Sequence, residues 1–442
     1  MRIKINNFGT ISQADVAIGG LTVITGENDT GKSTVGKILF SMIKAISRYE
    51  EDIEEDKEDR VTSIVEKIYF NLRRRINISE LPEIRDLFNP RKFYASLRLD
   101  VVKTINERER YLEHLALTGR LPELLAESAR EEIEKILLIM KEPDDELSAI
   151  NRALRKAFFS EFRGEIIQKG NTNNSKASIE VSDGASSLID ISWTKDGISQ
   201  FKYADGLGYS DSTYVDSPSV MQFHNLIRYA KTLFDGNVEP GRLTVPLHVK
   251  DLSTKLSESI YNVFGHINIF SSSTFNIESS KLSEKINSTF RGEVVFDIEQ
   301  NDFYLEKKGY KVTSGNIASG IKSLGMLDML IKCGSADENS LLIIDEPEVN
   351  LHPKWQIFYA EIICELVSLG VDIIITTHSP YIIDALKHYS DRLGIENHFY
   401  LTERFPDEDY TYFVDITNNV SHAIDLLASP LRELNQESLD DF

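Results

Sequence analysis

Residues 26–34 carry the side chains with the clearest chemistry in this 442-residue chain. The segment from Gly26 to Ser33 fits the pattern G-x-x-x-x-G-K-[ST] of a phosphate-binding loop. Glycines let backbone N–H groups approach phosphate oxygens, and the amino end of the following helix attracts anions. We therefore expect a bound nucleoside triphosphate, with Lys32 at its β- and γ-phosphates and Ser33 as a ligand of Mg²⁺. The residues expected to contact the nucleotide are Gly26, Glu27, Asn28, Asp29, Thr30, Gly31, Lys32, Ser33 and Thr34.

Two adjacent carboxylates, Asp345 and Glu346, follow the apolar run 341–344. A buried parallel strand delivers its last side chains to the carboxyl edge of the sheet, where phosphates bind. We expect Asp345 to hold Mg²⁺ through water, and Glu346 to act as the general base for the attacking water. An Asp-Glu pair alone is as often a helix cap, so this expectation depends on the phosphate-binding loop.

His378 and the pair Ser319-Gly320 are further candidates. His378 comes directly after the predicted strand 371–376, and a histidine at such a strand end can reach a γ-phosphate or the attacking water. Ser319 and Gly320 begin a predicted helix, whose first N–H groups can bind an anion. Each feature alone is more often structural, and each gains meaning from the loop and the carboxylates.

The predicted elements that position these residues indicate an α/β fold. The last third of the chain alternates strands and helices, which is typical of a mostly parallel sheet. Residues 61–167 show helical periodicity throughout, too short and too interrupted for a long coiled-coil arm. We expect a nucleotide-binding head formed by 1–49 and 169–442, with a helical insertion at 50–168. Expected strands are 3–8, 14–18, 21–25, 177–181, 187–193, 199–203, 212–215, two pieces within 293–304, 341–345, 371–376, 397–401 and 411–416; expected helices of the head are 32–47, 220–233, 247–264, 319–333, 354–369 and 380–388.

Composition narrows the class further. The net charge of −21 argues against a protein that coats nucleic acid with its whole surface. Cys333 and Cys364 belong to no CxxC motif or Cys/His cluster, which predicts neither a disulfide nor a zinc site. No apolar stretch is long enough for a signal peptide or a membrane span, so we expect a cytoplasmic protein. The acidic run 407–409 is predicted to be a turn and not a metal site.

The motifs, in this order, resemble the ABC-type ATPase head of SMC, RecF and OLD-family proteins. Residues 26–34 match its Walker A motif, and 341–346 match its Walker B motif with the catalytic Glu. The run 346–353 (Glu-Pro-Glu-Val-Asn-Leu-His-Pro) is similar to the stretch that leads into the D-loop of the RecF/OLD-like branch. Thr377-His378-Ser379-Pro380 is similar to the segment of its switch histidine, and 7–11 is also typical of that branch.

The resemblance covers about 1–49 and 175–425, and it departs from the family at one motif. Ala318-Ser319-Gly320-Ile321-Lys322 keeps the Ser and Gly of the Leu-Ser-Gly-Gly-Gln signature but not its last two positions. The departure bears on how tightly one subunit grips the nucleotide of the other.

The resemblance implies a two-lobe P-loop NTPase head with a mixed sheet and a helical insertion, using ATP and Mg²⁺. It also implies a head-to-tail dimer with two ATP molecules at the interface. One subunit then supplies Lys32, Ser33, Asp345, Glu346 and His378, with Glu346, His378 and Lys32 catalytic, and the other supplies Ser319 and Gly320. Gln222 is the candidate for the Q-loop glutamine at the metal, although an ordinary helix-start residue is an equal alternative.

OLD-family proteins continue into a TOPRIM nuclease, whereas only residues 347–442 follow Glu346 here. We therefore expect a slow, regulatory ATPase subunit that controls a separate effector such as a TOPRIM or HNH nuclease. Such subunits occur in bacterial anti-phage systems, for example AriA of PARIS and PtuA of Septu.

The alternative is a RecF- or SMC-like ATPase that acts directly on DNA for repair or loading. It requires a basic groove, for which 73–75, Arg91-Lys92 and Lys322 are the available residues, although a solvated helix face is the better explanation for each of them. The ATPase half of a membrane transporter fits poorly with 348–353 and with the large helical insertion.

Overall fold

The computed structural model describes residues 1–76, 81–168, 176–233, 243–265, 273–405 and 410–429. The chain forms two compact units, one made of Met1–Ser47 and Ala153–Phe442 and the other of Arg48–Arg152. The predicted turn at 407–409 lies outside the described residues.

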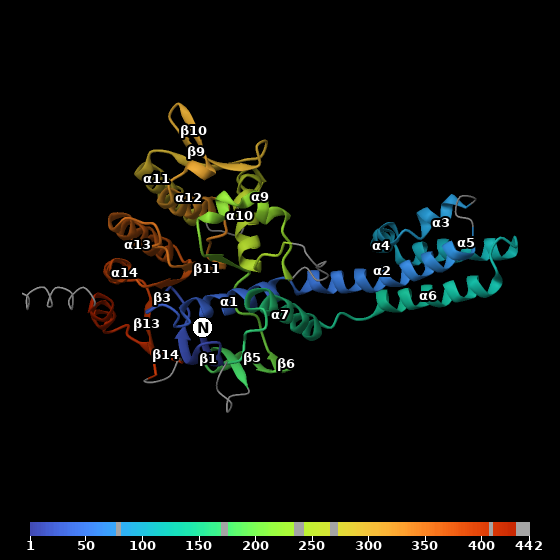
Figure 1. Cartoon of the computed structure of the whole chain (residues 1–442), viewed down its shortest axis with the longest axis horizontal. Coiled ribbons are helices and arrows are strands. Elements are labelled where there is room, and N and C mark those ends of the chain that lie inside the picture. The colour runs from blue at the N-terminus through green and yellow to red at the C-terminus, as the bar shows by residue number, and fades with distance from the viewer. Residues whose placement is uncertain (77–80, 169–175, 234–242, 266–272, 406–409, 430–442) are drawn as a thin grey trace, which may run out of the picture. The chain divides into compact units, whose positions relative to one another are not determined.

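The larger unit contains a mixed sheet with the order β6-β5-β4-β1-β2-β14-β13-β3-β12-β11-β7 (Figure 1). β13, β3, β12, β11 and β7 run parallel to one another, whereas β6, β5, β4, β1 and β2 are joined by antiparallel pairs. This arrangement confirms the predicted α/β class with a mixed sheet and a helical region. The strands are β1 Arg2–Phe8, β2 Ile11–Ala17, β3 Leu21–Gly26, β4 Ala177–Asp183, β5 Ser186–Thr194, β6 Gly197–Tyr203, β7 Asp211–Val215, β11 Ser340–Asp345, β12 Asp372–Thr377, β13 Asn397–Arg404 and β14 Thr411–Asp415.

The central strands are mostly apolar and buried along almost their whole length. β3 is buried at every position, and β11 and β12 are buried at nearly every position. Parallel strands in α/β proteins are covered on both faces, so they show continuous apolar runs in place of alternation. The helices of this unit are α1 Lys32–Ser47, α8 Ser219–Gln222, α9 His224–Tyr229, α10 Leu247–Gly265, α11 Ser273–Phe290, α12 Ser319–Lys332, α13 Pro353–Ser368 and α14 Pro380–Leu393.

A small antiparallel sheet, β10-β9-β8, packs with α12 in the same unit (Figure 1). Phe296 and Phe303 contribute to the core that also holds Leu324 and Leu327 of α12. The sequence predicts two strand pieces here, and the structure adds a third, β10. The strands are β8 Glu293–Asp297, β9 Asp302–Lys307 and β10 Tyr310–Thr313.

The boundary after the helical insertion falls earlier in the chain than the expected residue 168. Helix α7, Glu146–Phe162, begins in the smaller unit, but its end belongs to the larger one. Phe158 and Phe162 pack edge-on against Phe8, and Phe158 also contacts Trp193 of β5. These aromatic contacts connect the end of α7 to the sheet, which is why the smaller compact unit ends at Arg152.

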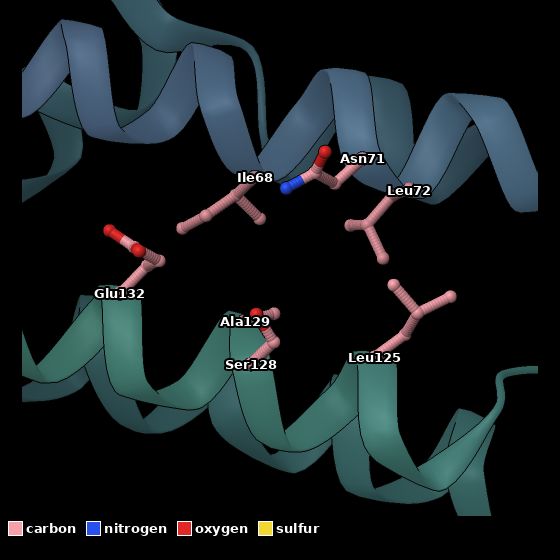
Figure 2. Close-up of a pocket in the computed structure, with 7 residues that line it drawn as sticks. All are labelled: Ile68, Asn71, Leu72, Leu125, Ser128, Ala129 and Glu132. Carbon is pink, nitrogen blue, oxygen red and sulfur yellow. The ribbon is translucent and has the colours of Figure 1, made fainter.

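The smaller unit is helical and has its own core. Ile68 and Leu72 of α2 face Leu125 and Ala129 of α6 (Figure 2). The hollow left between them is about 10 Å³, room for no more than about one water molecule. The interface is therefore packing and not a ligand site. The helices here are α2 Tyr49–Arg75, α3 Pro82–Leu87, α4 Pro90–Leu99, α5 Val101–Leu117 and α6 Glu123–Lys141.

The charged residues at the two ends of α2 have the signs that the helix dipole favours. The first turn holds Glu50, Glu51 and Asp52, and the last turn holds the exposed residues 73–75, all arginine. Anions at the amino end and cations at the carboxyl end each stabilise a helix by roughly 0.3–1 kcal/mol. Both sets of charges therefore stabilise α2. Among the described residues, no helix is long and apolar enough to cross a membrane.

Candidate functional site

The carboxyl ends of β3, β12, β11 and β7 meet at one edge of the sheet. β12 pairs with β3 so that Thr377 lies opposite Thr25, and with β11 so that Thr376 lies opposite Asp345. This register places the phosphate-binding loop, Asp345 and His378 at the ends of adjacent strands. Ligands of open α/β sheets bind at such an edge.

Backbone geometry explains the two glycines of the loop. Gly26 has φ +143° and Gly31 has φ +82°, values that L side chains rarely adopt. A Cβ atom on Gly26 would lie 2.0 Å from Thr402 Oγ1, and one on Gly31 would lie 2.7 Å from Ile11 Cγ1. Side chains of the neighbouring strands β13 and β2 therefore leave no space for a Cβ atom, and only glycine fits at these positions.

Two residues of strand β13 make hydrogen bonds with the loop and with the end of β3. Thr402 shares a 2.6 Å hydrogen bond with the hydroxyl of Thr30 and donates a 3.1 Å hydrogen bond to the carbonyl of Thr25. The exposed Arg404 donates to the carbonyls of Asn28 and Asp29 at 3.1 and 3.4 Å. The sequence contains no pattern that would have assigned Thr402 or Arg404 to the loop.

Lys32 is 4% exposed, and its ammonium lies within the loop. Its Nζ donates to the carbonyls of Gly26 at 3.1 Å and Glu27 at 2.6 Å. Burial lowers the pKa of Lys32, and the nearby carboxylates of Glu346 and Asp345 oppose that shift. An anionic phosphate beside the ammonium would favour its charged form.

Three hydroxyl groups donate hydrogen bonds to the carboxylate of Asp345. Its Oδ1 accepts hydrogen bonds from Ser33 Oγ at 2.8 Å and from Thr376 Oγ1, and its Oδ2 accepts one from Tyr214 at 2.9 Å. Burial and the adjacent Asp345 carboxylate raise the pKa of Tyr214 well above its ordinary value, so the phenol keeps its proton and donates. Ser33 and Asp345 were predicted for this site, whereas Tyr214 and Thr376 were not.

The oxygens of Ser33 and Asp345 suit Mg²⁺, which prefers oxygen ligands. The 2.8 Å hydrogen bond from Ser33 Oγ to Asp345 Oδ1 brings the two oxygens together at this edge. The donor set of this edge is therefore compatible with the metal that the sequence motifs imply.

Glu346 and His378 lie side by side at the same edge. Glu346 has φ +47°, a left-handed conformation that is uncommon for residues other than glycine. Its N–H donates to the carbonyl of Thr376 at 3.0 Å, and its Oε1 lies 3.4 Å from His378 Nδ1. Strained backbone of this kind persists where the surrounding structure holds it, and it is concentrated at functional sites.

A third acidic residue, Glu348, contacts the same histidine. Its Oε1 accepts the N–H of His378 at 2.7 Å and the hydroxyl of Thr377 at 2.8 Å. The sequence motif contained Glu348, but periodicity and composition gave no sign that its carboxylate would turn inward.

The remaining predicted residues lie on other elements. Ser319 and Gly320 begin α12, and a Cβ on Gly320 would lie 3.1 Å from the ring of Trp355. Gln222 ends α8, and its Oε1 accepts a 3.3 Å hydrogen bond from Lys322 of α12. Within the described part of the chain, no hydrogen bond or ion pair joins Ser319 or Gln222 to the phosphate-binding loop or to Asp345.

Comparisons with known proteins place the chain in a family. Residues 21–384, from β3 to α14, match the family described as "AAA domain, putative AbiEii toxin, Type IV TA system". The match includes Lys32, Ser33, Asp345, Glu346 and His378, and it spans well over half of the chain. The chain therefore belongs to this family of P-loop ATPase domains. Among curated proteins there is no significant match to the sequence.

Solved structures of SMC head domains are similar to the chain at low sequence identity. The SMC head domain from Thermotoga maritima is 11% identical, with a TM-score of 0.39, and the match covers 94% of this chain and 97% of that one. An Smc head domain with an extended coiled coil, bound to the C-terminal domain of ScpA derived from Pyrococcus furiosus, is 10% identical. Its TM-score is 0.43, and 98% of each chain is covered.

Proposed function

We propose that this chain binds and hydrolyses ATP, and that two copies sandwich the nucleotide in a head-to-tail dimer that regulates a separate effector. One observation carries the proposal. Ser33 Oγ lies 2.8 Å from Asp345 Oδ1 although the residues are 312 positions apart. The phosphate-binding loop and the acidic strand end thus form one site, with Glu346 and His378 beside it.

Each residue has a role that its position supports. Lys32 and the loop N–H groups bind the phosphates, and Ser33 and Asp345 hold the metal. Bound Mg²⁺ would neutralise phosphate charge and polarise the γ-phosphoryl group. Glu346 accepts a proton from the attacking water, and His378 orients that water or the γ-phosphate.

Hydrolysis is tested by phosphate release under saturating ATP and Mg²⁺. Lys32→Ala removes the ammonium from the phosphates, and Glu346→Gln removes the general base, so each should reduce kcat by about 100-fold or more. Glu396→Gln, an exposed carboxylate just before β13, is the matched control and should leave the rate unchanged. Wild-type protein that binds ATP without releasing phosphate would contradict the proposal.

A second copy completes the site in this proposal, because Ser319 and Gly320 resemble the signature that contacts ATP from the opposite subunit. Complementation tests this sharing. Lys32→Ala disables only a copy's own loop, and Ser319→Arg disables only its signature. Each variant alone should be inactive, but a mixture should regain up to about half of the wild-type activity, since each mixed dimer contains one intact site out of two. A mixture that stays inactive while both variants still associate counts against the shared site.

The regulated effector, expected to be a nuclease of an anti-phage system, is the finer part of the proposal. The family description names a toxin of a toxin–antitoxin system, which by its name contains a second component. A P-loop ATPase whose nucleotide joins two copies can act as a switch for such a component. Co-purification with the product of a neighbouring gene tests this role. Recovery of an isolated dimer that gives no phenotype under phage challenge would contradict it.

Direct action on DNA is the second candidate, favoured by the exposed arginines at 73–75 and by Arg91. Lys322 does not belong to this set, because it is buried and donates to Gln222. The test is DNA-stimulated ATP hydrolysis. Binding through phosphate contacts predicts stimulation that falls steeply with added salt.

A further inference from the structure

The turn between β11 and α13, residues 346–352, is joined to the end of β12 by a buried carboxylate. Glu348 is 7% exposed. Its Oε1 accepts two hydrogen bonds, from Thr377 Oγ1 at 2.8 Å and from the N–H of His378 at 2.7 Å. Burying a carboxylate costs free energy unless hydrogen bonds compensate for the lost water. The change of chain direction in this turn does not by itself require an acidic side chain at this position.

The same carboxylate reaches the imidazole. His378 Nδ1 lies 3.3 Å from Glu348 Oε1 and 3.4 Å from Glu346 Oε1. Among the described residues, this nitrogen is buried beside both carboxylates without a hydrogen bond to either, whereas the His378 side chain as a whole is 41% exposed. The exposed part of the ring is therefore the part away from Nδ1. This leaves Nε2 available to a bound nucleotide or to water.

A second set of buried hydrogen bonds holds the neighbouring backbone. Ser379 donates its N–H to Thr377 Oγ1 at 3.0 Å and its hydroxyl to Gln356 Oε1 at 2.6 Å. Gln356 Nε2 in turn donates to the carbonyl of Leu351 at 3.0 Å. The segment 377–379 is thus connected to both ends of the turn that carries Glu348.

We propose that Glu348 is a positioning residue, which holds the backbone and the Nδ1 side of His378 so that Nε2 faces the γ-phosphate or the attacking water. The inference rests on the proposed ATPase function. A carboxylate beside one ring nitrogen commonly fixes the orientation of a functional histidine and the proton on that nitrogen. Among the described residues, Glu348 makes no hydrogen bond to Ser33 or Asp345. Its charge acts on Lys32 only from a distance, so its main effect on the reaction should pass through His378.

A double-mutant cycle between Glu348 and His378 tests the inference, using kcat and KM for ATP in the full chain. Glu348→Ala should lower kcat by roughly 10- to 100-fold, the usual effect of misplacing a catalytic group by about 1 Å. KM should change by no more than about 2-fold, because Glu348 does not bind the nucleotide. In the His378→Ala background, Glu348→Ala should cause no further loss of kcat.

Melting temperatures distinguish a positioning role of Glu348 from a contribution to folding stability alone. Glu348→Ala should lower the melting temperature by a similar amount in both backgrounds, whereas its effect on kcat should appear only where His378 is present. Glu348→Gln keeps an acceptor for Thr377 and for the N–H of His378, so it should recover most of the lost kcat. Asp328→Asn is the matched control: its buried carboxylate pairs with Lys332 on α12, and its substitution should show no coupling to His378.

Each outcome has a definite meaning. If Glu348→Ala does not fold, the cycle is run with Glu348→Asp, whose shorter side chain cannot reach the N–H of His378 and should lose kcat only in the presence of His378. Equal losses of kcat in both backgrounds, or no loss at all, would overturn the positioning role while leaving the ATPase intact. Wild-type protein without ATP hydrolysis would overturn the proposed function and, with it, this inference.

Discussion

At the scale of single residues, Asp345 organises the candidate site. Three hydroxyls donate to its two oxygens, and they come from α1, β7 and β12. Hydrogen bonds around a metal-binding carboxylate fix its orientation, and their loss commonly costs 10- to 100-fold in metal affinity or activity.

Tyr214→Phe tests this arrangement with little change in shape. The substitution removes the hydroxyl that donates to Asp345 Oδ2. We expect the Mg²⁺ concentration for half-maximal ATP hydrolysis to rise by roughly 10-fold or more. Tyr209→Phe is the control, because Tyr209 donates to Asp372 at 2.7 Å at the opposite end of β12. Equal Mg²⁺ requirements for both variants would contradict the role of Tyr214.

The sequence predicted the loop, Asp345 and Glu346 because those residues follow fixed local patterns. Tyr214 and Thr376 belong to no such pattern. They reach Asp345 only because β7 and β12 flank β11 in parallel register, with Ile344 opposite Val215 and Asp345 opposite Thr376. That register follows from long-range packing, so the roles of these hydroxyls require the structure.

At the scale of elements, α10 connects β7, α1 and the end of α7 through His248. The ring of His248 packs against Tyr214 and Phe40, and Nδ1 lies 2.5 Å from Glu161 Oε2. On the other side, Nε2 lies 3.4 Å from Asp216 Oδ2. Burial alone would lower the pKa of His248, but the two carboxylates outweigh it and raise the pKa to about 9.

This raised pKa makes folding stability depend on pH. Because the folded protein binds the proton more tightly than the unfolded chain, the stabilisation is complete below about pH 6.5. It is lost as the pH rises through about 9, and its size is on the order of 3 kcal/mol. His248→Gln should therefore lower the melting temperature at pH 6.5 much more than at pH 9.5. His422→Gln, an exposed histidine, should leave both values unchanged. A deficit in His248→Gln that is independent of pH would contradict the charged His248.

Elements with strong periodicity were predicted well, and elements shaped by tertiary contacts were not. The predicted strands 341–345 and 371–376 correspond to β11 and β12, and the helix 319–333 corresponds to α12. The predicted helix 220–233 is instead two short helices, α8 and α9. Phe223 lies between them and takes a non-helical conformation. The order of strands in the sheet was not predictable, because neighbours such as β2 and β14, or β3 and β13, are far apart in the sequence.

At the scale of the whole molecule, the chain divides into two compact units. The candidate site lies entirely within the unit formed by Met1–Ser47 and Ala153–Phe442. The helical unit Arg48–Arg152 has a separate core that includes Phe88, Phe93 and Ile133. No motif within 48–152 predicts its role.

The helical unit should fold by itself. Because its core is self-contained, the isolated segment 48–152 should show a helical circular dichroism spectrum and one cooperative thermal transition. Ile133→Asp places a charge in the core and should abolish that transition. Glu109→Ala, at a partly exposed position of α5, serves as the control and should preserve it. A gradual, non-cooperative melt of the unmodified segment would contradict independent folding.

Nucleotide-dependent association is the most direct test of the shared site, because it requires the loop of one copy and the signature of the other to contact the same ATP. The measurement is light scattering of Glu346→Gln with and without ATP and Mg²⁺, with Lys32→Ala/Glu346→Gln as the control that cannot bind the phosphates. Glu346→Gln should have the mass of one chain without ATP and the mass of two chains with ATP, and the control should show no change. Glu346→Gln protein that binds ATP and keeps the mass of one chain would contradict the shared site.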